Sequence, residues 1–347
     1  MPFKGRFKPF SLLLTGAPGW LCDSMLAQLG DTLPALTRVR CLVQSSTPEE
    51  RIRTWALAFP SVNEMVLGDL LDPASLKPAF EDMRGGVVLH AAAVFQPKKI
   101  SDYYAVNRDG ALALAEIAKQ AGVRRFVFIS STSAQGSSSS AQQILTEAMP
   151  ARPYSHYGKS KLAAEQGLMK LHAPGKFDVV IVRPGPFYGT PVPPHHVELF
   201  KRLRQGRISL VGGGRYARSW SHIDDVAAGA IACLTHPAAG GETFNLCDSQ
   251  PYSQREIFEA AADALSVKLR FRPVPGFAAS IAHLTGKIKA QFDRYDKWIH
   301  ALADQNRHTG VSSEKAQRLL GFSPRVTPHE GIAAAVAWCR DHDLIEQ

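Results

Sequence analysis

The chain has 347 residues and a net charge of +9, and 45% of its residues are hydrophobic and 20% charged. This length allows one large domain or two medium ones, and the composition is that of an ordinary globular protein. No apolar run approaches the roughly 18 residues of a membrane-spanning helix, and the run from Phe10 to Leu14 after the basic start is too short for a signal peptide.

The positive charge has three interpretations: a generally basic surface, a preference for anionic small molecules, or attraction to an anionic membrane or nucleic acid. No dense Lys/Arg run with interleaved aromatic residues is present, so we do not expect a nucleic-acid partner. The five cysteines are scattered and form no Cys-x-x-Cys pair. This pattern favours reduced thiols in a cytoplasmic protein over a disulfide framework or a metal site.

The first expected strand, residues 11–15, leads into Gly16-Ala17-Pro18-Gly19 and then into a helical pattern. A strand, a glycine turn and a helix in this order are typical of a dinucleotide-binding loop. Gly16 permits the tight turn, and Gly19 lets the backbone approach a pyrophosphate at the helix N-terminus. The usual third glycine position holds Cys22, which predicts less close packing of helix and strand.

The second expected strand, residues 39–43, ends at Gln44, a position that commonly chooses between NAD and NADP. An acidic residue there would bind the ribose hydroxyls, but none is present, and Arg51 and Arg53 follow. The prediction is NAD or NADP, with a slight preference for NADP.

Further apolar strands are expected at residues 65–67, 87–90, 126–130 and 177–183, with helical segments between them. This alternation predicts an α/β fold of the Rossmann type, with a doubly wound parallel sheet. Ala91-Ala92-Ala93 follows one strand, which either leaves room for a flat ligand or packs a helix closely on the sheet.

Hydroxyl side chains at 130–133 end the strand before a polar stretch, where open α/β sheets place their ligand site. Residues 137–140 are all serine and predict a mobile loop. Tyr157 and Lys161 follow, four residues apart on an expected helix, so their side chains share one face. An ammonium beside a phenol favours the phenolate, which makes this pair a candidate acid/base unit.

From residue 190 the pattern becomes mostly helical, and we expect a smaller substrate lobe. The predicted dinucleotide-binding domain is 1–189 with 219–248 returning to it, and the lobe is 190–218 and 249–347. Within the lobe, Phe277, Ile281, Leu284 and Ile288 lie at helical spacing. Core packing or a substrate wall is the favoured interpretation, and peripheral membrane contact is the alternative.

The chain resembles the extended short-chain dehydrogenase/reductase family over almost its full length. The similarity rests on a set of short motifs in the family's order and spacing. These are Thr-Gly-x-x-Gly at 15–19, Gly68-Asp69, His90-Ala-Ala, Asn107-x-x-Gly110, Phe-Ile-Ser-Ser at 128–131, Tyr157-x-x-x-Lys161, Arg-Pro-Gly-Pro-Phe-Tyr-Gly at 183–189, His-Ile-Asp-Asp-Val at 222–226 and a closing signature from Ala316 to Trp338. Cys22 is the clearest departure from the family pattern.

The resemblance implies roles for individual residues. Tyr157 would be the general acid/base, Lys161 would hold the nicotinamide ribose, Ser131 would bind the substrate oxygen, and Asn107 would support the site. Thr132 and Ser133 compete with Ser131 for the substrate. The implied cofactor-binding residues are Gly16, Ala17, Pro18, Gly19, Trp20, Leu21, Gln44, Asp69, Leu70, Ala91, Ala92, Ala93, Ser130, Tyr157, Lys161 and Pro184.

The family contains nucleotide-sugar epimerases and dehydratases as well as alcohol and ketone oxidoreductases. The C-terminal part resembles the 3β-hydroxysteroid dehydrogenase-like branch, whereas Arg218 stands where the sugar-nucleotide branch has its diphosphate-binding arginine. We favour an oxidoreductase for a secondary alcohol or ketone of a hydrophobic, steroid-like or lipid-like substrate. The alternatives are a nucleotide-sugar epimerase and, less favoured, a non-catalytic nucleotide-binding protein. The resemblance also implies a homodimer.

Overall fold

A computed structural model describes residues 9–30 and 33–346. The basic residues 1–8 and the first part of the predicted domain 1–189 lie outside this range. The strands are β1 (Phe10–Ala17), β2 (Leu36–Gln44), β3 (Glu64–Gly68), β4 (Val87–His90), β5 (Arg125–Ile129), β6 (Asp178–Pro184), β7 (Phe187–Tyr188), β8 (Arg207–Val211), β9 (Ala217–Arg218), β10 (Ser221–His222), β11 (Thr243–Leu246), β12 (Tyr252–Ser253) and β13 (Arg270–Val274). The α-helices are α1 (Trp20–Leu29), α2 (Glu49–Ala58), α3 (Pro73–Leu76), α4 (Ile100–Tyr104), α5 (Ala111–Gln120), α6 (Thr132–Gln135), α7 (His156–Leu171), α8 (Pro194–Arg204), α9 (Ile223–Thr235), α10 (Gln254–Leu265), α11 (Gly276–Gln291), α12 (Lys297–Ala303), α13 (Glu314–Leu320) and α14 (Pro328–Asp341). Short helical turns are η1 (Lys77–Phe80), η2 (Ala105–Gly110), η3 (Gly212–Gly214), η4 (Pro237–Ala239) and η5 (Asp304–Asn306).

The described residues form a seven-stranded sheet in the order β11-β6-β5-β4-β1-β2-β3, and every neighbouring pair is parallel. The strand order reverses between β1 and β4, as in doubly wound folds that bind a ligand at that point. Strands covered on both faces must be apolar throughout, and β4 and β5 are buried along their whole lengths. The predicted Rossmann-type α/β fold is confirmed.

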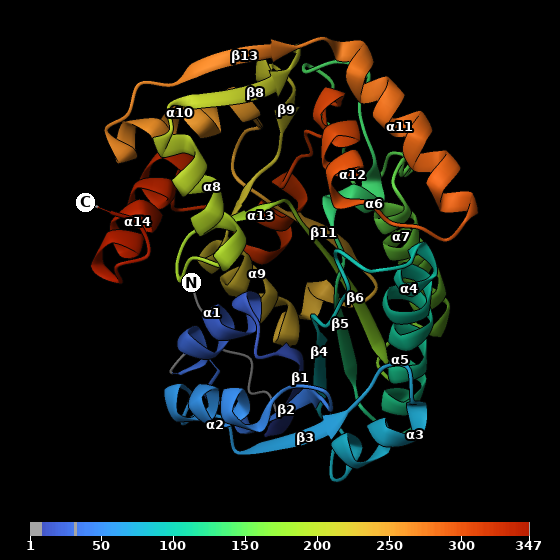
Figure 1. The fold of residues 1–347 in the computed structure, drawn as a ribbon. Helices are drawn as coiled ribbons and strands as arrows, with labels where there is room; N and C mark the ends of the chain where they lie inside the picture. The colour runs from blue at the N-terminus through green and yellow to red at the C-terminus, as the bar shows by residue number, and fades with distance from the viewer. Residues whose placement is uncertain (1–8, 31–32, 347) are drawn as a thin grey trace.

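Two apolar layers cover the sheet (Figure 1). One contains α1 and α9, with Met25, Val226 and Ile231 against the strands. The other contains α5 and α7, with Leu114 and Leu168 among its buried residues. Both helix layers rest on the sheet, so the strand ends stay fixed relative to α1 and α7.

A third apolar cluster forms the lobe around α8, α10 and α14, and β8 pairs with β13 beside it. The predicted division into two domains stays a prediction. Ala316 and Phe322, in the C-terminal half of the chain, are buried in the same layer as α1 and α9. Along the sequence, the chain therefore returns to the sheet after most of the residues of the lobe.

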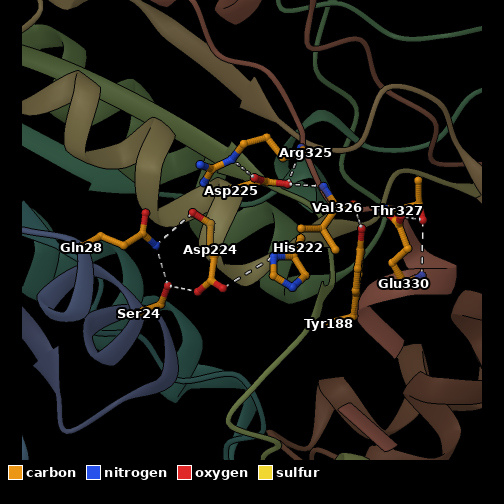
Figure 2. Close-up of polar contacts among 10 residues, drawn as sticks. All are labelled: Ser24, Gln28, Tyr188, His222, Asp224, Asp225, Arg325, Val326, Thr327 and Glu330. Carbon is orange, nitrogen blue, oxygen red and sulfur yellow. Dashed lines mark hydrogen bonds and ion pairs between the residues drawn. The ribbon is translucent and has the colours of Figure 1, made fainter. Parts of the chain in front are cut away.

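At the start of α9, segment 219–248 is fixed to α1 and to the residues that precede α14 (Figure 2). Ser24 of α1 donates to Asp224 at 2.6 Å, and Gln28 donates to the Asp224 carbonyl at 3.1 Å. The carboxylate of Asp225 accepts the backbone N–H of Arg325 at 2.9 Å. These contacts join the nucleotide-loop helix, the returning helix and the segment before α14.

Asp248 lies beside this junction, and its side chain is an internal pH-dependent element. The Tyr188 hydroxyl is 3.0 Å from Asp248 Oδ2 and 2.7 Å from the Val326 carbonyl, so one proton serves two acceptors. Burial raises the pKa of Asp248 to about 7, with the nearby Asp225 acting in the same direction. A protonated Asp248 can donate to Tyr188 while Tyr188 donates to Val326, which explains why the neutral form fits.

Replacing Asp248 by asparagine is expected to remove a pH-dependent loss of stability. Because the folded pKa is raised, the native state keeps a proton that the unfolded chain releases, so stability from this group falls as the pH rises from about 4 to about 7. Asp248→Asn should gain free energy of unfolding relative to wild type over this window, on the order of 2–4 kcal/mol. Urea unfolding at about pH 4 and about pH 7 measures this gain in free energy of unfolding. The control is Asp263→Asn, which changes an exposed carboxylate. A difference independent of pH would contradict the assignment.

Two sequence predictions concern individual segments outside the sheet. In the all-serine segment 137–140, the Ser138 N–H donates to the His308 carbonyl at 2.9 Å, and the predicted mobility of this segment stays a prediction. The predicted core-packing role of Phe277, Ile281, Leu284 and Ile288 is wrong, since these side chains are 51–66% exposed, whereas the substrate-wall role stays a prediction. The helical spacing of these four residues is confirmed, but their side chains point to solvent and not to the core. No helix within the described residues is long and apolar enough to cross a membrane.

Candidate active site

Helix α7 places Tyr157 and Lys161 on one face, beside the carboxyl end of the sheet. The helix begins at a cap in which the Ser155 hydroxyl accepts the Gly158 N–H at 3.1 Å. Tyr157 therefore stands in the first turn, and Lys161 stands one turn deeper, where it is 1% exposed.

The Tyr157 phenol is half-buried and has Ser131 as its hydrogen-bond partner. Burial raises the pKa of Tyr157 to about 12, and the hydrogen bond from Ser131 opposes that rise. Lys161 Nζ donates to the Ile129 carbonyl at 2.8 Å, and burial lowers the pKa of Lys161 to about 7. The expected lowering of the phenol pKa by the ammonium is therefore absent here, because Lys161 faces the end of β5. Two of its three donors remain for another ligand.

Ser131 reaches Tyr157 because it lies at the N-terminal end of α6, directly after β5. Its hydroxyl accepts the Ser133 N–H at 3.1 Å, which fixes its rotamer. Thr132 is 4% exposed, so its hydroxyl is the least accessible of the three candidates for substrate contact. Ser133 is half-buried. The assignment of Ser131 to the substrate oxygen stays a prediction that this geometry favours.

Gly158 permits the close approach of α7 to α6. A Cβ at this position would lie 2.2 Å from the Ser133 carbonyl oxygen and 3.1 Å from Cβ of Pro153. Backbone atoms cannot move aside as a flexible side chain can. The absence of a side chain at 158 is thus what brings Ser131 within reach of Tyr157.

Gly158→Ala is expected to lower activity at least tenfold and stability by about 1–3 kcal/mol, because α7 must move away from α6. Turnover and urea unfolding measure the two effects. The matched control is Gly286→Ala in α11, whose added Cβ meets Ile299 at an ordinary 3.5 Å. Equal effects of the two substitutions would contradict the role assigned to Gly158.

The glycine loop after β1 is held against the loop after β4. Gly16 has φ +95°, and a Cβ there would lie 2.8 Å from Ala92 N. The Thr15 hydroxyl accepts the Ala92 N–H at 3.2 Å and is 2.6 Å from His90 Nδ1. Burial lowers the pKa of His90 to about 3, so the ring is neutral. Thr15 and His90 were not among the predicted site residues, although both stand in the quoted motifs.

Gly19 caps α1 without a side chain, so the first N–H groups of this ten-residue helix have no partner within the helix. A Cβ at Gly19 would lie 2.3 Å from the Gly16 carbonyl oxygen and close the loop. These features fit the pyrophosphate of a dinucleotide. Cys22 is 1% exposed, and its thiol contacts the Thr15 carbonyl at 3.5 Å. Its side chain is accommodated between helix and strand.

The remaining predicted cofactor residues follow the strands of the sheet, whose carboxyl ends share one edge. Gln44 ends β2 and is exposed, and Asp69 follows β3, where its Oδ1 accepts the Leu71 N–H at 2.9 Å. Asn107 is fully buried and bonds both the N–H and the carbonyl of Val94, at 2.8 and 3.0 Å. Asn107 is therefore placed to support the loop that contains Val94 and not to contact a cofactor or substrate directly. The other predicted positions at this edge are Ala17, Pro18, Trp20, Leu21, Leu70, Ala91, Ala93, Ser130 and Pro184.

A buried ionic network behind the site was missed by the sequence interpretation. Glu165 accepts from Arg183 Nε at 2.9 Å and also from the Ser130 hydroxyl. Arg183 also donates to Gln135 at the end of α6. The four side chains are 1–6% exposed. They tie α7, β6, the end of β5 and α6 together, which fixes Ser131 relative to Tyr157 and Lys161.

The mouth of the site has an aromatic side, next to the Tyr157 ring. Phe95, 63% exposed, meets Tyr157 edge-on at 5.2 Å, and Tyr103 lies 5.9 Å from the same ring. On β9, Arg218 donates to the Asp304 carbonyl, and its Nε has no hydrogen-bond partner in the described part of the chain. The assignment of Arg218 to the substrate stays a prediction.

Residues 12–247 match the model of the NAD dependent epimerase/dehydratase family. The chain belongs to this family. It is similar to the uncharacterised protein y4nL of Sinorhizobium fredii, with 32% identity over 94% of each chain. It is also similar to a 4-hydroxy-2-methyl-3-oxo-4-farnesyl-3,4-dihydroquinoline-1-oxide ketoreductase of Stigmatella aurantiaca, with 26% identity over 92% of this chain and 94% of the other.

Among solved structures, the protein is similar to the dTDP-glucose 4,6-dehydratase DesIV of Streptomyces venezuelae, with NAD and TYD bound. The TM-score is 0.75 with 26% identity over 96% of this chain and 97% of the other. The protein is an NAD-dependent enzyme of the epimerase/dehydratase type, which confirms the predicted nicotinamide dinucleotide. The preference for NADP stays a prediction.

Proposed function

We propose that this enzyme interconverts a secondary alcohol and a ketone on a hydrophobic substrate, with Tyr157 as the general acid/base. The observation that carries the proposal is the aromatic side of the mouth, where the exposed Phe95 contacts the Tyr157 ring and the buried Tyr103 packs behind it. Rings at this distance provide an apolar wall for a flat or alicyclic substrate. A bulky polar group would lose hydration there without regaining hydrogen bonds.

The chemistry divides between the cofactor and the side chains. The nicotinamide supplies or accepts the hydride. Tyr157, which burial keeps protonated at neutral pH, donates a proton to the carbonyl oxygen. Ser131 donates a hydrogen bond to the same oxygen, and Lys161 offers its two remaining donors to the nicotinamide ribose. A protonated phenol is the form that can donate to the carbonyl oxygen during ketone reduction, and the reverse reaction requires the phenolate.

The relative from Stigmatella aurantiaca gives further support, because its name describes a ketoreductase acting on a farnesyl-bearing substrate. Arg218 favours a second candidate, a nucleotide-sugar epimerase. Its guanidinium has a buried Nε with no hydrogen-bond partner among the described residues. That donor suits a diphosphate oxygen.

Two assays separate the candidates. Net oxidation of NADH or NADPH in the presence of alicyclic and prenylated aromatic ketones indicates the oxidoreductase. Interconversion of UDP-sugar epimers without net change in cofactor absorbance indicates the epimerase and would overturn the main proposal. Arg218→Met provides the internal control, since it should abolish epimerase activity but leave ketone reduction within severalfold.

A further inference from the structure

Helix α11 presents its large apolar side chains to solvent and its small ones to the protein. Ala279 and Ala282 are 0% and 6% exposed, and Gly286 is buried with them. At about 3.6 residues per turn, the exposed Phe277, Ile281, Leu284 and Ile288 form one stripe opposite that buried face, and Phe292 extends it at 72% exposure. Figure 1 shows α11 at the outer edge of the molecule.

The surface around this stripe is cationic. Lys287, Arg294 and Lys297 are exposed and have no ion-pair partner within residues 9–30 and 33–346. The two acidic residues nearby are engaged: Asp293 accepts the Ser101 N–H and hydroxyl, each at 2.7 Å, and Asp296 pairs with Lys289 at 2.6 Å. Asp293 keeps its charge, because its Ser101 donors are neutral. The four cations Lys287, Lys289, Arg294 and Lys297 outnumber the two carboxylates, so the net charge of the face is positive, in a chain whose net charge is +9.

An exposed tryptophan, Trp298, stands on the neighbouring helix α12. Trp298 at the start of α12 is 59% exposed, and Arg202 and Lys297 each lie 5.1 Å from its ring. Tryptophan is enriched at the boundary between lipid chains and headgroups, where an apolar ring sits beside polar groups. The apolar stripe and the flanking cations are the features of a helix that lies in the headgroup region, and Trp298 adds an exposed ring on the neighbouring helix α12.

We propose that α11, with Phe292 and Trp298, docks the enzyme on the surface of an anionic lipid bilayer. A second copy fits this face less well, because a symmetric contact would oppose Lys287, Arg294 and Lys297 with themselves. Anionic headgroups complement these charges, and the bilayer covers the apolar stripe. This docking goes beyond the proposed activity and does not depend on it.

The docked face is connected to the mouth of the site. Asp293, just after α11, bonds Ser101 in the segment that follows Phe95. The Tyr295 ring contacts Tyr103 at 5.8 Å, and Tyr103 contacts Tyr157. The segment that follows α11 therefore packs against the residues that surround Tyr157.

Vesicle flotation with the full chain tests the proposal, with vesicles of phosphatidylcholine alone and of phosphatidylcholine mixed with phosphatidylglycerol. We expect binding to the anionic vesicles that weakens as salt is added. The double variant Ile281→Gln/Ile288→Gln should reduce the partition coefficient at least about tenfold. Lys287→Gln/Lys297→Gln should reduce it about fivefold for each lysine. Both pairs are exposed, so the variants should keep the wild-type melting temperature.

The matched control is Leu57→Gln on α2, which removes an 82% exposed leucine away from the face and should bind like wild type. Absence of binding to anionic vesicles would overturn the proposal, as would equal binding to both vesicle types. Size-exclusion chromatography with light scattering gives a further check. A dimer that Ile281→Gln/Ile288→Gln converts to a monomer would assign the face to a second copy instead.

Discussion

Tyr157→Phe is expected to reduce cofactor-dependent turnover by about 10²- to 10⁴-fold while NADH and NADPH bind as before. The substitution removes the hydroxyl that Ser131 contacts and keeps the ring, which packs edge-on against Phe95. The loss therefore reports proton transfer rather than packing. Steady-state kinetics and fluorescence titration of the cofactor measure the two quantities separately.

The control is Tyr216→Phe, which removes a phenol hydroxyl in the lobe, where the ring lies against His308. It should leave turnover unchanged. Turnover of Tyr157→Phe at the wild-type rate would show that another group carries the proton. A pH profile adds a second readout, because alcohol oxidation needs the phenolate and its rate should rise with pH towards the raised pKa of Tyr157.

The central strands of the sheet, such as β4 and β5, were predictable because both of their faces are buried. Such strands read as continuous apolar runs, and glycine or polar residues mark their ends, as at Gly16 and Asp69. The i,i+4 spacing of Tyr157 and Lys161 then placed both on one helix face, and the structure has them there. These features depend on local sequence alone.

The direction of α11 could not be predicted from the spacing of its apolar residues. Four large apolar residues at helical spacing form a stripe whether it faces the core or the solvent. The decisive signal was on the opposite face, where Ala279, Ala282 and Gly286 are small enough to pack closely on the protein. Small residues repeating opposite a large apolar stripe indicate an exposed stripe, and this pattern was present in the sequence.

The charge state of the site depends on contacts between distant segments. The Tyr157 pKa follows from burial and from Ser131, and Lys161 faces Ile129 rather than the phenol. Sequence spacing brings two groups onto a face but does not fix the direction of a flexible lysine. Glu165 could have been found, since it lies four residues beyond Lys161 on the same helix. Its partner Arg183 is on another strand.

Arg183→Met is expected to cost about 3–5 kcal/mol of stability, because it leaves the buried Glu165 carboxylate without its guanidinium. Glu165→Leu should cost a similar amount by stranding Arg183. The double variant should recover much of the loss, since an apolar pair replaces the ionic one. Urea unfolding of the four proteins gives the coupling energy, with the exposed pair of Arg53 and Glu49 as a control worth less than about 1 kcal/mol.

The same cycle tests whether the network positions the site. Glu165 and Arg183 do not touch Tyr157, but they fix Ser130 and Gln135, which flank Ser131 in the chain. The double variant should therefore regain stability without regaining full turnover, with kcat reduced more than KM is raised. If the double variant recovered both stability and turnover in full, the network would have a structural role only. Additive losses in the unfolding cycle would mean that Glu165 and Arg183 do not act as a pair.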